Sequence, residues 1–260
     1  METIYRLIDS GHERKLEQFG PYLIERPCPM ALYKPKTSSW RPDASFCRQE
    51  GWRYQKKLPL FWEVVFKGLK FKVSLTEFGH IGLFPEHAMH WNLYAKKALN
   101  LFAYSGGMSL ALAKQGAEVC HVDASKPMVA WARENAELNG IGTIRWIVDD
   151  ALKFLKREAK RGAKYDGIVL DPPTYGRGNQ GQVFKIERDL PLLLEVIKEV
   201  LTPEKSFVLL TTHTPGLTQT ILGRMLTDAL GDGIITGNEM LLEGEVPSGY
   251  FARWNANECT

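Results

Sequence analysis

The sequence contains no internal repeat, no low-complexity tract and no apolar run long enough to cross a membrane. A membrane-spanning helix needs roughly 18 or more apolar residues in a row, and no run here approaches that length. The opening stretch, METIYRLIDSGHERK, is charged and lacks the apolar segment of a secretory signal. We therefore expect a cytoplasmic protein with no membrane partner.

Cysteine is scarce and scattered. The four cysteines are Cys28, Cys47, Cys120 and Cys259. Their separations match neither a metal-ligand pattern nor a disulfide framework. We expect reduced thiols, as in a cytosolic protein, and no metal site.

The chain is long and apolar enough for a large core, with 260 residues, 44% of them hydrophobic, and seven tryptophans. It has a net charge of +3. Residues 1–92 hold 14 Lys and Arg against 10 Asp and Glu, and residues 93–260 hold 19 against 20, so the positive charge lies in the front part. A front of +4 suits a polyanion such as RNA, but an ordinary solvated surface gives the same balance.

After about residue 95, strand-like and helix-like patterns alternate. Predicted strands cover residues 98–103, 117–123, 143–150, 165–171 and 206–212. Predicted helices cover residues 108–115, 125–140, 151–162, 188–201 and 217–230, and two further strands fall within 233–244 and 248–254. Ser125 is placed to cap the second helix, Pro127 fits its first turn and Gly140 its end. The order predicts an α/β fold: a mainly parallel sheet with helices on both faces and an antiparallel terminal hairpin.

The front part has a different pattern. Residues 62–84 alternate apolar and polar side chains, with turns at Lys67-Gly68 and Phe78-Gly79, which predicts a small antiparallel sheet. Residues 1–50 are rich in proline and aromatic side chains and contain YKPKTSSWRPD, so we expect irregular structure there. We predict a small N-terminal β-rich subdomain over residues 1–92 and a main domain over residues 93–260.

A glycine pair follows the first strand of the main domain, and an acidic residue ends the next strand. In an open α/β sheet, ligands bind at the carboxyl ends of the strands. Gly106 and Gly107 let a ligand approach the backbone, and Asp123 is placed to accept hydrogen bonds from ribose hydroxyls. Asp149 and Asp150 end the third strand, within reach of an adenine. This combination predicts a nucleoside-bearing cofactor, although a plain strand-to-helix turn also uses such glycines.

Two nucleoside-bearing cofactors are candidates for a site with this pattern. A nicotinamide dinucleotide site normally shows G-x-G-x-x-G, which makes room for a pyrophosphate. The segment here is AYSGGMSLA, which lacks the third glycine. S-adenosylmethionine has no phosphate and needs no such loop, so the sequence favours it.

The segment LDPPTYGRG, Leu170 to Gly178, follows the fourth strand. Pro172 and Pro173 fix the backbone and remove two amide donors, which leaves the Asp171 carboxylate and nearby carbonyls as acceptors. Tyr175 offers a flat stacking surface. A surface turn is the alternative, because Asp-Pro-Pro also favours turns.

With these motifs the chain resembles the class I S-adenosylmethionine-dependent methyltransferases, and more closely the branch of large-subunit rRNA methyltransferases. The resemblance covers roughly residues 50–256, through LNLFAYSGGMSLALAKQGAEVCHVDASKPMVAWARENAELNG, IVDDALKFL, LDPPTYGRG and HIGLFPEHAMHW. It implies a Rossmann-like, seven-stranded sheet behind a small N-terminal α+β unit, without the separate RNA-binding domain of some members. At Ala88 the chain departs from the branch, which has arginine there.

The resemblance also implies roles for single residues. Tyr104, Ser105, Gly106 and Gly107 would line the methionine end of the cofactor, Asp123 with Ala124 the ribose, and Asp149 and Asp150 the adenine. Asp171, Pro172, Pro173 and Tyr175 would form the catalytic loop, with Asp171 also near the cofactor's amino group. Phe84 and His87 would lie close to the cofactor.

The absence of a cysteine after the fifth strand bears on which atom of the acceptor receives the methyl group. Methylation of cytosine at C5 requires a cysteine thiolate, which in this branch follows the fifth strand. This chain has LLTTHTPG there, with Thr211, Thr212 and His213, and no cysteine between Cys120 and Cys259. We therefore predict methylation of a base nitrogen, most simply in ribosomal RNA. His213 is either a base or a structural histidine.

Other side chains are candidates for holding the RNA. Arg177 and Lys185 are candidates for phosphate contacts, and Trp52, Trp91 and Tyr175 for base stacking, with a core role favoured for the tryptophans. The alternatives are a protein or small-molecule acceptor and a non-catalytic RNA-binding assembly factor. Both a monomer and a homodimer are compatible with the sequence.

Overall fold

The computed structural model describes residues 4–177, 181 and 183–257, which divide into two compact units. The first unit runs to Ala88 and also includes Leu241–Ser248. The second unit holds Met89–Met240 and the chain from Gly249 onward. No helix in the described part of the chain is both long and apolar enough to span a bilayer.

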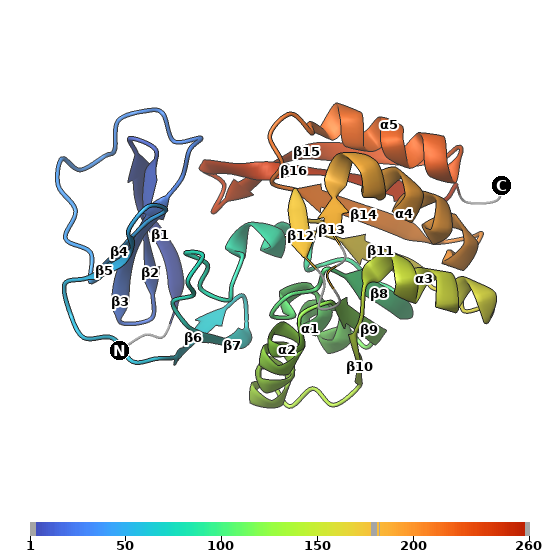
Figure 1. Ribbon diagram of the computed structural model, residues 1–260, viewed down its shortest axis with the longest axis horizontal. Helices are drawn as coiled ribbons and strands as arrows, with labels where there is room; N and C mark the ends of the chain where they lie inside the picture. Colours follow the sequence, from blue (N-terminus) through green and yellow to red (C-terminus); the bar gives the residue numbers. More distant parts are fainter. Residues whose placement is uncertain (1–3, 178–180, 182, 258–260) are drawn as a thin grey trace. The chain divides into compact units, whose positions relative to one another are not determined.

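The second unit is built on a seven-stranded sheet with the strand order β10-β9-β8-β11-β14-β16-β15 (Figure 1). The strands are β8 (Lys97–Leu101), β9 (Glu118–Asp123), β10 (Ile144–Val148), β11 (Gly167–Leu170), β14 (Phe207–Thr212), β15 (Ile234–Leu242) and β16 (Val246–Asn255). Neighbours from β10 to β14 are parallel, and β14 pairs with β16 antiparallel. The predicted Rossmann-like sheet with its terminal hairpin is confirmed.

Helices cover both faces of this sheet. They are α1 (Gly107–Lys114), α2 (Lys126–Leu138), α3 (Ala151–Lys160), α4 (Ile186–Val200) and α5 (Gln219–Leu230). On β8, Leu99 and Leu101 belong to the apolar core that α3, α4 and α5 share, while the Asn100 side chain between them bonds to Ser109 on α1. Because successive side chains of a strand point to opposite faces, α1 lies on the face opposite α3–α5. Helix α2 begins after Ser125, which occupies the N-cap position as predicted, but its side chain makes no capping hydrogen bond.

A short hairpin of β12 (Tyr175–Arg177) and β13 (Val183–Lys185) follows Asp171. The sequence predicted only a loop between the fourth strand and the next helix. Gly176 lies so close to Pro173 that a β-carbon on it would come within 3.2 Å of the Pro173 ring, so the turn and the hairpin pack on each other. Gly178, the last residue of the LDPPTYGRG motif, lies outside the described residues.

The first unit contains two small sheets. One has the order β1-β2-β3-β4-β5, formed by Tyr5–Gly11, Arg14–Phe19, Tyr22–Pro27, Ala44–Cys47 and Gly51–Tyr54. It is antiparallel except for the parallel pair β3–β4. The other pairs β6 (Trp62–Phe66) with β7 (Leu69–Val73), antiparallel as predicted. Lys67 and Gly68 join β6 to β7 with φ of 48° and 75°, the left-handed pair that suits a two-residue hairpin turn. A 3₁₀ helix spans Pro85–His90.

The expectation of irregular structure over residues 1–50 was wrong outside one stretch. Residues 33–43 are irregular, but the strands on either side of them form the five-stranded sheet. Buried charges hide the strand pattern: Glu17 is fully buried, and Arg26 donates to both of its carboxylate oxygens at 2.7 and 2.8 Å. Charged side chains therefore stand where a half-buried strand normally shows apolar ones.

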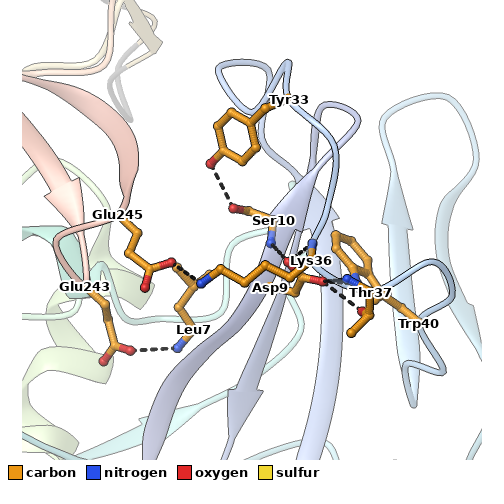
Figure 2. Close-up of polar contacts among 9 residues, drawn as sticks. All are labelled: Leu7, Asp9, Ser10, Tyr33, Lys36, Thr37, Trp40, Glu243 and Glu245. Atoms are coloured by element: carbon orange, nitrogen blue, oxygen red, sulfur yellow. Dashed lines mark hydrogen bonds and ion pairs between the residues drawn. The ribbon is translucent and has the colours of Figure 1, made fainter.

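The tip of the β15–β16 hairpin belongs to the first unit and is attached there by two glutamates (Figure 2). Glu243 accepts a hydrogen bond of 3.0 Å from the Leu7 backbone amide, and Glu245 pairs with Lys36 at 2.7 Å. Nearby, the Asp9 carboxylate accepts hydrogen bonds from the Lys36 amide, from Thr37 and from the Trp40 indole. Burial opposes the charge of Asp9, but these hydrogen bonds outweigh it and hold its pKa well below the usual range.

Candidate active site

The turn after β8 has an unusual backbone. Phe102, Tyr104 and Gly106 all have positive φ, at 54°, 48° and 90°. For the two aromatic residues this conformation costs about 1 kcal/mol or more each, and such strain clusters at functional sites. A β-carbon on Gly106 would lie 3.1 Å from Cβ of Ala132 on α2. Gly106 is therefore required by its own conformation and by helix packing, in addition to any ligand.

Asp123 holds this turn from the end of the neighbouring strand. Its Oδ2 accepts a hydrogen bond of 2.9 Å from the Tyr104 amide, and its Oδ1 accepts one of 2.8 Å from the Ser125 amide. Burial raises the pKa of Asp123, and the two amides only partly offset that effect. Each carboxylate oxygen has more than one acceptor position, so the group fixes the turn and can also accept from a diol.

Asn135 is a part of the site that the sequence analysis missed. Its side chain is fully buried in α2, and its amide donates a hydrogen bond of 2.9 Å to the Ser105 carbonyl in the turn. The available signal was its position on the buried stripe of α2 with Val129, Ala132 and Ala136. A polar residue on such a stripe needs a partner inside the protein.

The two acidic residues after β10, Asp149 and Asp150, have different partners. Asp150 is the N-cap of α3 and accepts a hydrogen bond of 2.9 Å from the Lys153 amide. Asp149 accepts from the Asp150 amide at 2.9 Å and pairs with Arg157 of α3. Both side chains are half-buried at the carboxyl end of β10, beside the end of β9. The adenine contact predicted for them stays a prediction.

Asp171 is oriented by the strand beside it. Thr211, fully buried at the end of β14, donates a hydrogen bond of 2.7 Å to Asp171 Oδ1. His213 Nε2 lies 4.0 Å from Asp171 Oδ2, and its side chain is 39% exposed. The His213 side chain is therefore accessible to solvent, whereas a histidine with only a structural role in the core would be buried. The carboxylate has one oxygen fixed by a hydroxyl and the other facing an accessible imidazole.

A pair of hydroxyls joins the loop after β11 to the loop after β14. Thr174 Oγ1 lies 2.7 Å from Thr214 Oγ1, and the Thr174 carbonyl accepts from the Ile186 amide at the start of α4. Within the same loop Pro172 is buried, whereas Pro173 is exposed and Tyr175 is 50% exposed. The loop is thus held at both ends and presents the tyrosine ring to solvent.

The other predicted residues differ in their burial and in their partners. Phe84 and His87 belong to the first unit, with ring centroids 6.0 Å apart, and their proximity to a cofactor stays a prediction. Trp91 is buried, and the half-buried Trp52 donates its indole N–H to the Thr76 carbonyl, which agrees with the core role. Lys185 is exposed at the start of α4, and the side chain of Arg177 lies outside the described residues.

Three buried polar side chains, those of Asn100, Ser109 and His121, form a chain of contacts next to the turn after β8. Asn100 donates to Ser109 Oγ at 2.9 Å, and Ser109 Oγ lies 3.0 Å from His121 Nδ1. Burial, with a smaller contribution from Arg133, lowers the pKa of His121 to about 3, so the ring is neutral at pH 7. The His121 ring also comes within 3.8 Å of the position that a Gly106 β-carbon would take.

The second unit therefore brings Gly106, Asp123, Asp150 and Asp171 to one edge of its sheet, the carboxyl ends of β8, β9, β10 and β11. This donor and acceptor set fits S-adenosylmethionine. A carboxylate with spare acceptor positions suits a ribose, and acidic and carbonyl oxygens suit a sulfonium and an amino group. The turn after β8 has no phosphate-binding glycine triplet.

Comparison with known proteins gives the same class. Residues 36–224 match the S-adenosylmethionine-dependent methyltransferase family, which is more than half of the chain. The chain belongs to this family, and its cofactor is S-adenosylmethionine. The fold and the site define a class I methyltransferase.

Particular relatives add detail. The structure is similar to the crystal structure of an S-adenosylmethionine-dependent methyltransferase from Agrobacterium tumefaciens, with 35% identity, a TM-score of 0.89, and coverage of 99% of this chain and 92% of that one. A methyltransferase structure complexed with SAH has 18% identity and a TM-score of 0.80, covers 97% and 74% of the two chains, and shows the shared fold.

A curated relative is the ribosomal RNA large subunit methyltransferase K/L of Pseudoalteromonas translucida. It is 35% identical over 150 residues, which are 54% of this chain. The chain spans about a fifth of that relative's length, since the match covers 21% of it.

Proposed function

We propose that this methyltransferase transfers the methyl group of S-adenosylmethionine to a base nitrogen of RNA, most simply ribosomal RNA. The observation that carries the proposal is the Asp171–Thr211–His213 arrangement. It brings a carboxylate and an accessible imidazole together beside the loop that we propose as catalytic, where enzymes that methylate cytosine at C5 need a thiolate. RNA as the acceptor is supported by the K/L relative's name and by the basic front part of the chain.

No described cysteine of the second unit other than Cys120 is available for carbon methylation, and Cys120 is unsuited to it. Its side chain is buried in β9, and burial raises the pKa of its thiol to about 11. A thiol with that pKa stays protonated at neutral pH and is a poor nucleophile. A nitrogen acceptor avoids this requirement, because its own lone pair attacks.

S-adenosylmethionine, when bound, supplies a methyl group on a sulfonium, which a nitrogen lone pair attacks in line. The protein's contribution is mainly to hold the acceptor in that line. Asp171 and the carbonyls of the proline-rich loop accept hydrogen bonds from an amino or imino group, because Pro172 and Pro173 offer no competing N–H. Asp171 or His213 takes the proton that a methylated N–H must lose, and a nitrogen without a proton needs neither as a base.

We also propose that the protein works in the cytoplasm, since Cys28, Cys47 and Cys120 are free thiols. The division into a small subdomain over residues 1–92 and a methyltransferase domain over residues 93–260 is likewise proposed, as are the cofactor and catalytic roles of the single residues named above.

The test is transfer of tritium from labelled S-adenosylmethionine into the RNA, protein and small-molecule fractions of a strain that lacks this protein. We expect label in RNA with the wild-type chain and none with Asp171→Ala. Label in protein or small molecules, with RNA unlabelled, would refute the RNA acceptor. RNA binding without transfer into any fraction would indicate an assembly factor.

A further inference from the structure

The positive charge of the first unit is concentrated in one stretch. Residues 51–79, from the start of β5 to the turn after β7, hold six Lys and Arg against two acidic residues. The remainder of residues 1–92 holds eight of each (14 less 6, and 10 less 2). The whole +4 excess of the front part therefore lies in this stretch.

The β6–β7 hairpin displays much of this charge on one face. Trp62, Val64 and Phe66 alternate with more accessible residues on β6, and Leu69, Phe71 and Val73 do so on β7. The outer face therefore carries Glu63, Val65, Lys70 and Lys72. Lys70 and Lys72 lie about 7 Å apart on that face, since they are two residues apart in a strand.

An aromatic side chain lies against these cations. Lys72 Nζ is 4.0 Å from the centre of the Phe61 ring, and Phe61 is 56% exposed. Lys57, four residues before Phe61, is exposed, as is Lys67 in the hairpin turn. An exposed aromatic ring among lysines is the combination that single-stranded RNA uses, with bases on the ring and phosphates on the cations.

The other two cations of the stretch, Arg53 and Lys56, lie outside the hairpin and contact acidic side chains. Arg53 forms an ion pair with Glu50, and Lys56 lies 2.5 Å from Asp43 Oδ1. We call Lys57, Phe61, Lys67, Lys70 and Lys72 together the basic hairpin surface, and Glu63, the register partner of Lys72, lies beside them. Lysines on a small exposed sheet also guard against edge-to-edge association, so the two roles need an experiment to separate them.

We propose that the basic hairpin surface binds the RNA backbone, with Phe61 stacking on a base. The proposal rests on the proposed function, because it names the surface that holds the same RNA. It makes Lys70 and Lys72 phosphate contacts, which position the RNA without reading its sequence. It makes Phe61 a sequence-tolerant stacking platform.

The test compares Lys70→Gln/Lys72→Gln and Phe61→Ala with Lys156→Gln/Lys160→Gln in the full-length protein. The control removes the same charge from exposed positions of α3. Binding of a fluorescent single-stranded RNA is followed by anisotropy between about 50 and 200 mM salt. Loss of two phosphate contacts should reduce the slope of log K against log salt by about 1.4. Phe61→Ala should weaken binding about tenfold and leave the slope unchanged.

Affinity for S-adenosylmethionine should be the same in all variants. The proposal is overturned if the Lys70/Lys72 variant matches the α3 control, or if it only aggregates more readily than wild type at unchanged RNA affinity. If the variants match the control while wild type labels RNA, the surface is wrong and the proposed function stands. If wild type neither binds nor labels RNA, both fail.

Discussion

The backbone amide of Tyr104 donates a hydrogen bond of 2.9 Å to Asp123 Oδ2, across the ends of two adjacent strands. The residue that donates has a positive φ, and the residue that accepts has a raised pKa because it is buried. The carboxylate that we assign to the ribose thus also fixes the turn that would line the methionine end. Damage to either residue should affect both halves of the cofactor site.

Replacement of Asp123 by asparagine should weaken binding of S-adenosylmethionine. One oxygen becomes an amino group, which faces the Tyr104 or the Ser125 amide and cannot accept from it. We expect a loss of about 2–4 kcal/mol, measured by titration calorimetry. Asp166→Asn is the matched control, because Asp166 also accepts from two backbone amides, those of Lys96 and Lys97, at the start of β8. Equal losses in the two variants would show that Asp123 acts only on folding.

Thr211→Val should slow methyl transfer and spare cofactor affinity. The substitution keeps the shape of a fully buried side chain and removes the hydroxyl that donates to Asp171. We expect a decrease in kcat of about tenfold, which corresponds to one charge-assisted hydrogen bond. Thr227→Val, which removes a hydroxyl that donates to the Gly223 carbonyl within α5, is the control. An unchanged kcat would mean that Asp171 needs no help in its orientation.

Gly106→Ala should destabilise the protein more than Gly116→Ala. Both glycines have a φ near 90°, but the Gly116 position is open and the Gly106 position meets Ala132 at 3.1 Å. The difference between their unfolding free energies isolates the contact from the backbone strain. We expect it to be about 1–3 kcal/mol, as for overpacking, and to shrink when Ala132→Gly is added. Equal losses in the two single variants would contradict this packing argument.

His121 should make stability fall as the solution becomes acidic. In the unfolded chain the imidazole takes up a proton near its ordinary pKa of 6.5, whereas in the folded protein it stays neutral down to about 3. The unfolded state therefore binds more protons in this range. Its contribution to the unfolding free energy is complete above pH 6.5 and is lost by up to about 1.4 kcal/mol per unit as pH falls toward 3.

The check is the pH dependence of thermal unfolding. His121→Asn keeps an acceptor for Ser109 and removes the titration, so its profile should be flatter than that of wild type between pH 6.5 and 4. His12→Asn, at an exposed position with positive φ that asparagine tolerates, should leave the profile unchanged. A His121→Asn profile parallel to that of wild type would show that this histidine does not govern acid stability.

The fold of the second unit could be predicted because its signals are local. Its parallel strands are largely apolar, helices α3, α4 and α5 are amphipathic, and Pro127 and Gly140 mark the ends of α2. The five-stranded sheet of the first unit could not be predicted in this way. Its strands bury Glu17, Arg26 and Lys15, whose charges compensate one another, because Glu17 on β2 pairs with Lys15 of the same strand and with Arg26 of the neighbouring strand β3. A hydrophobic pattern carries no information about such pairing.

In the site, too, the residues with a local sequence signal could be predicted and those placed by the fold could not. Residues that end strands, such as Asp123 and Asp171, could be found from the order of the elements. The residues that orient them could not, because Asn135 reaches Ser105 across 30 positions and Thr211 reaches Asp171 across 40. In the first unit, Glu243 and Glu245 reach Leu7 and Lys36 across 236 and 209 positions.

The most direct test of the account is to identify the methylated nucleoside. RNA from a strain that lacks this protein is incubated with the wild-type chain and S-adenosylmethionine, digested, and analysed by nucleoside mass spectrometry. The account predicts one new nucleoside methylated on a ring or exocyclic nitrogen, absent with Asp171→Ala. Formation of 5-methylcytidine would contradict it, because this product requires a thiolate, and the one described thiol of the second unit, Cys120, is buried in β9 with a raised pKa.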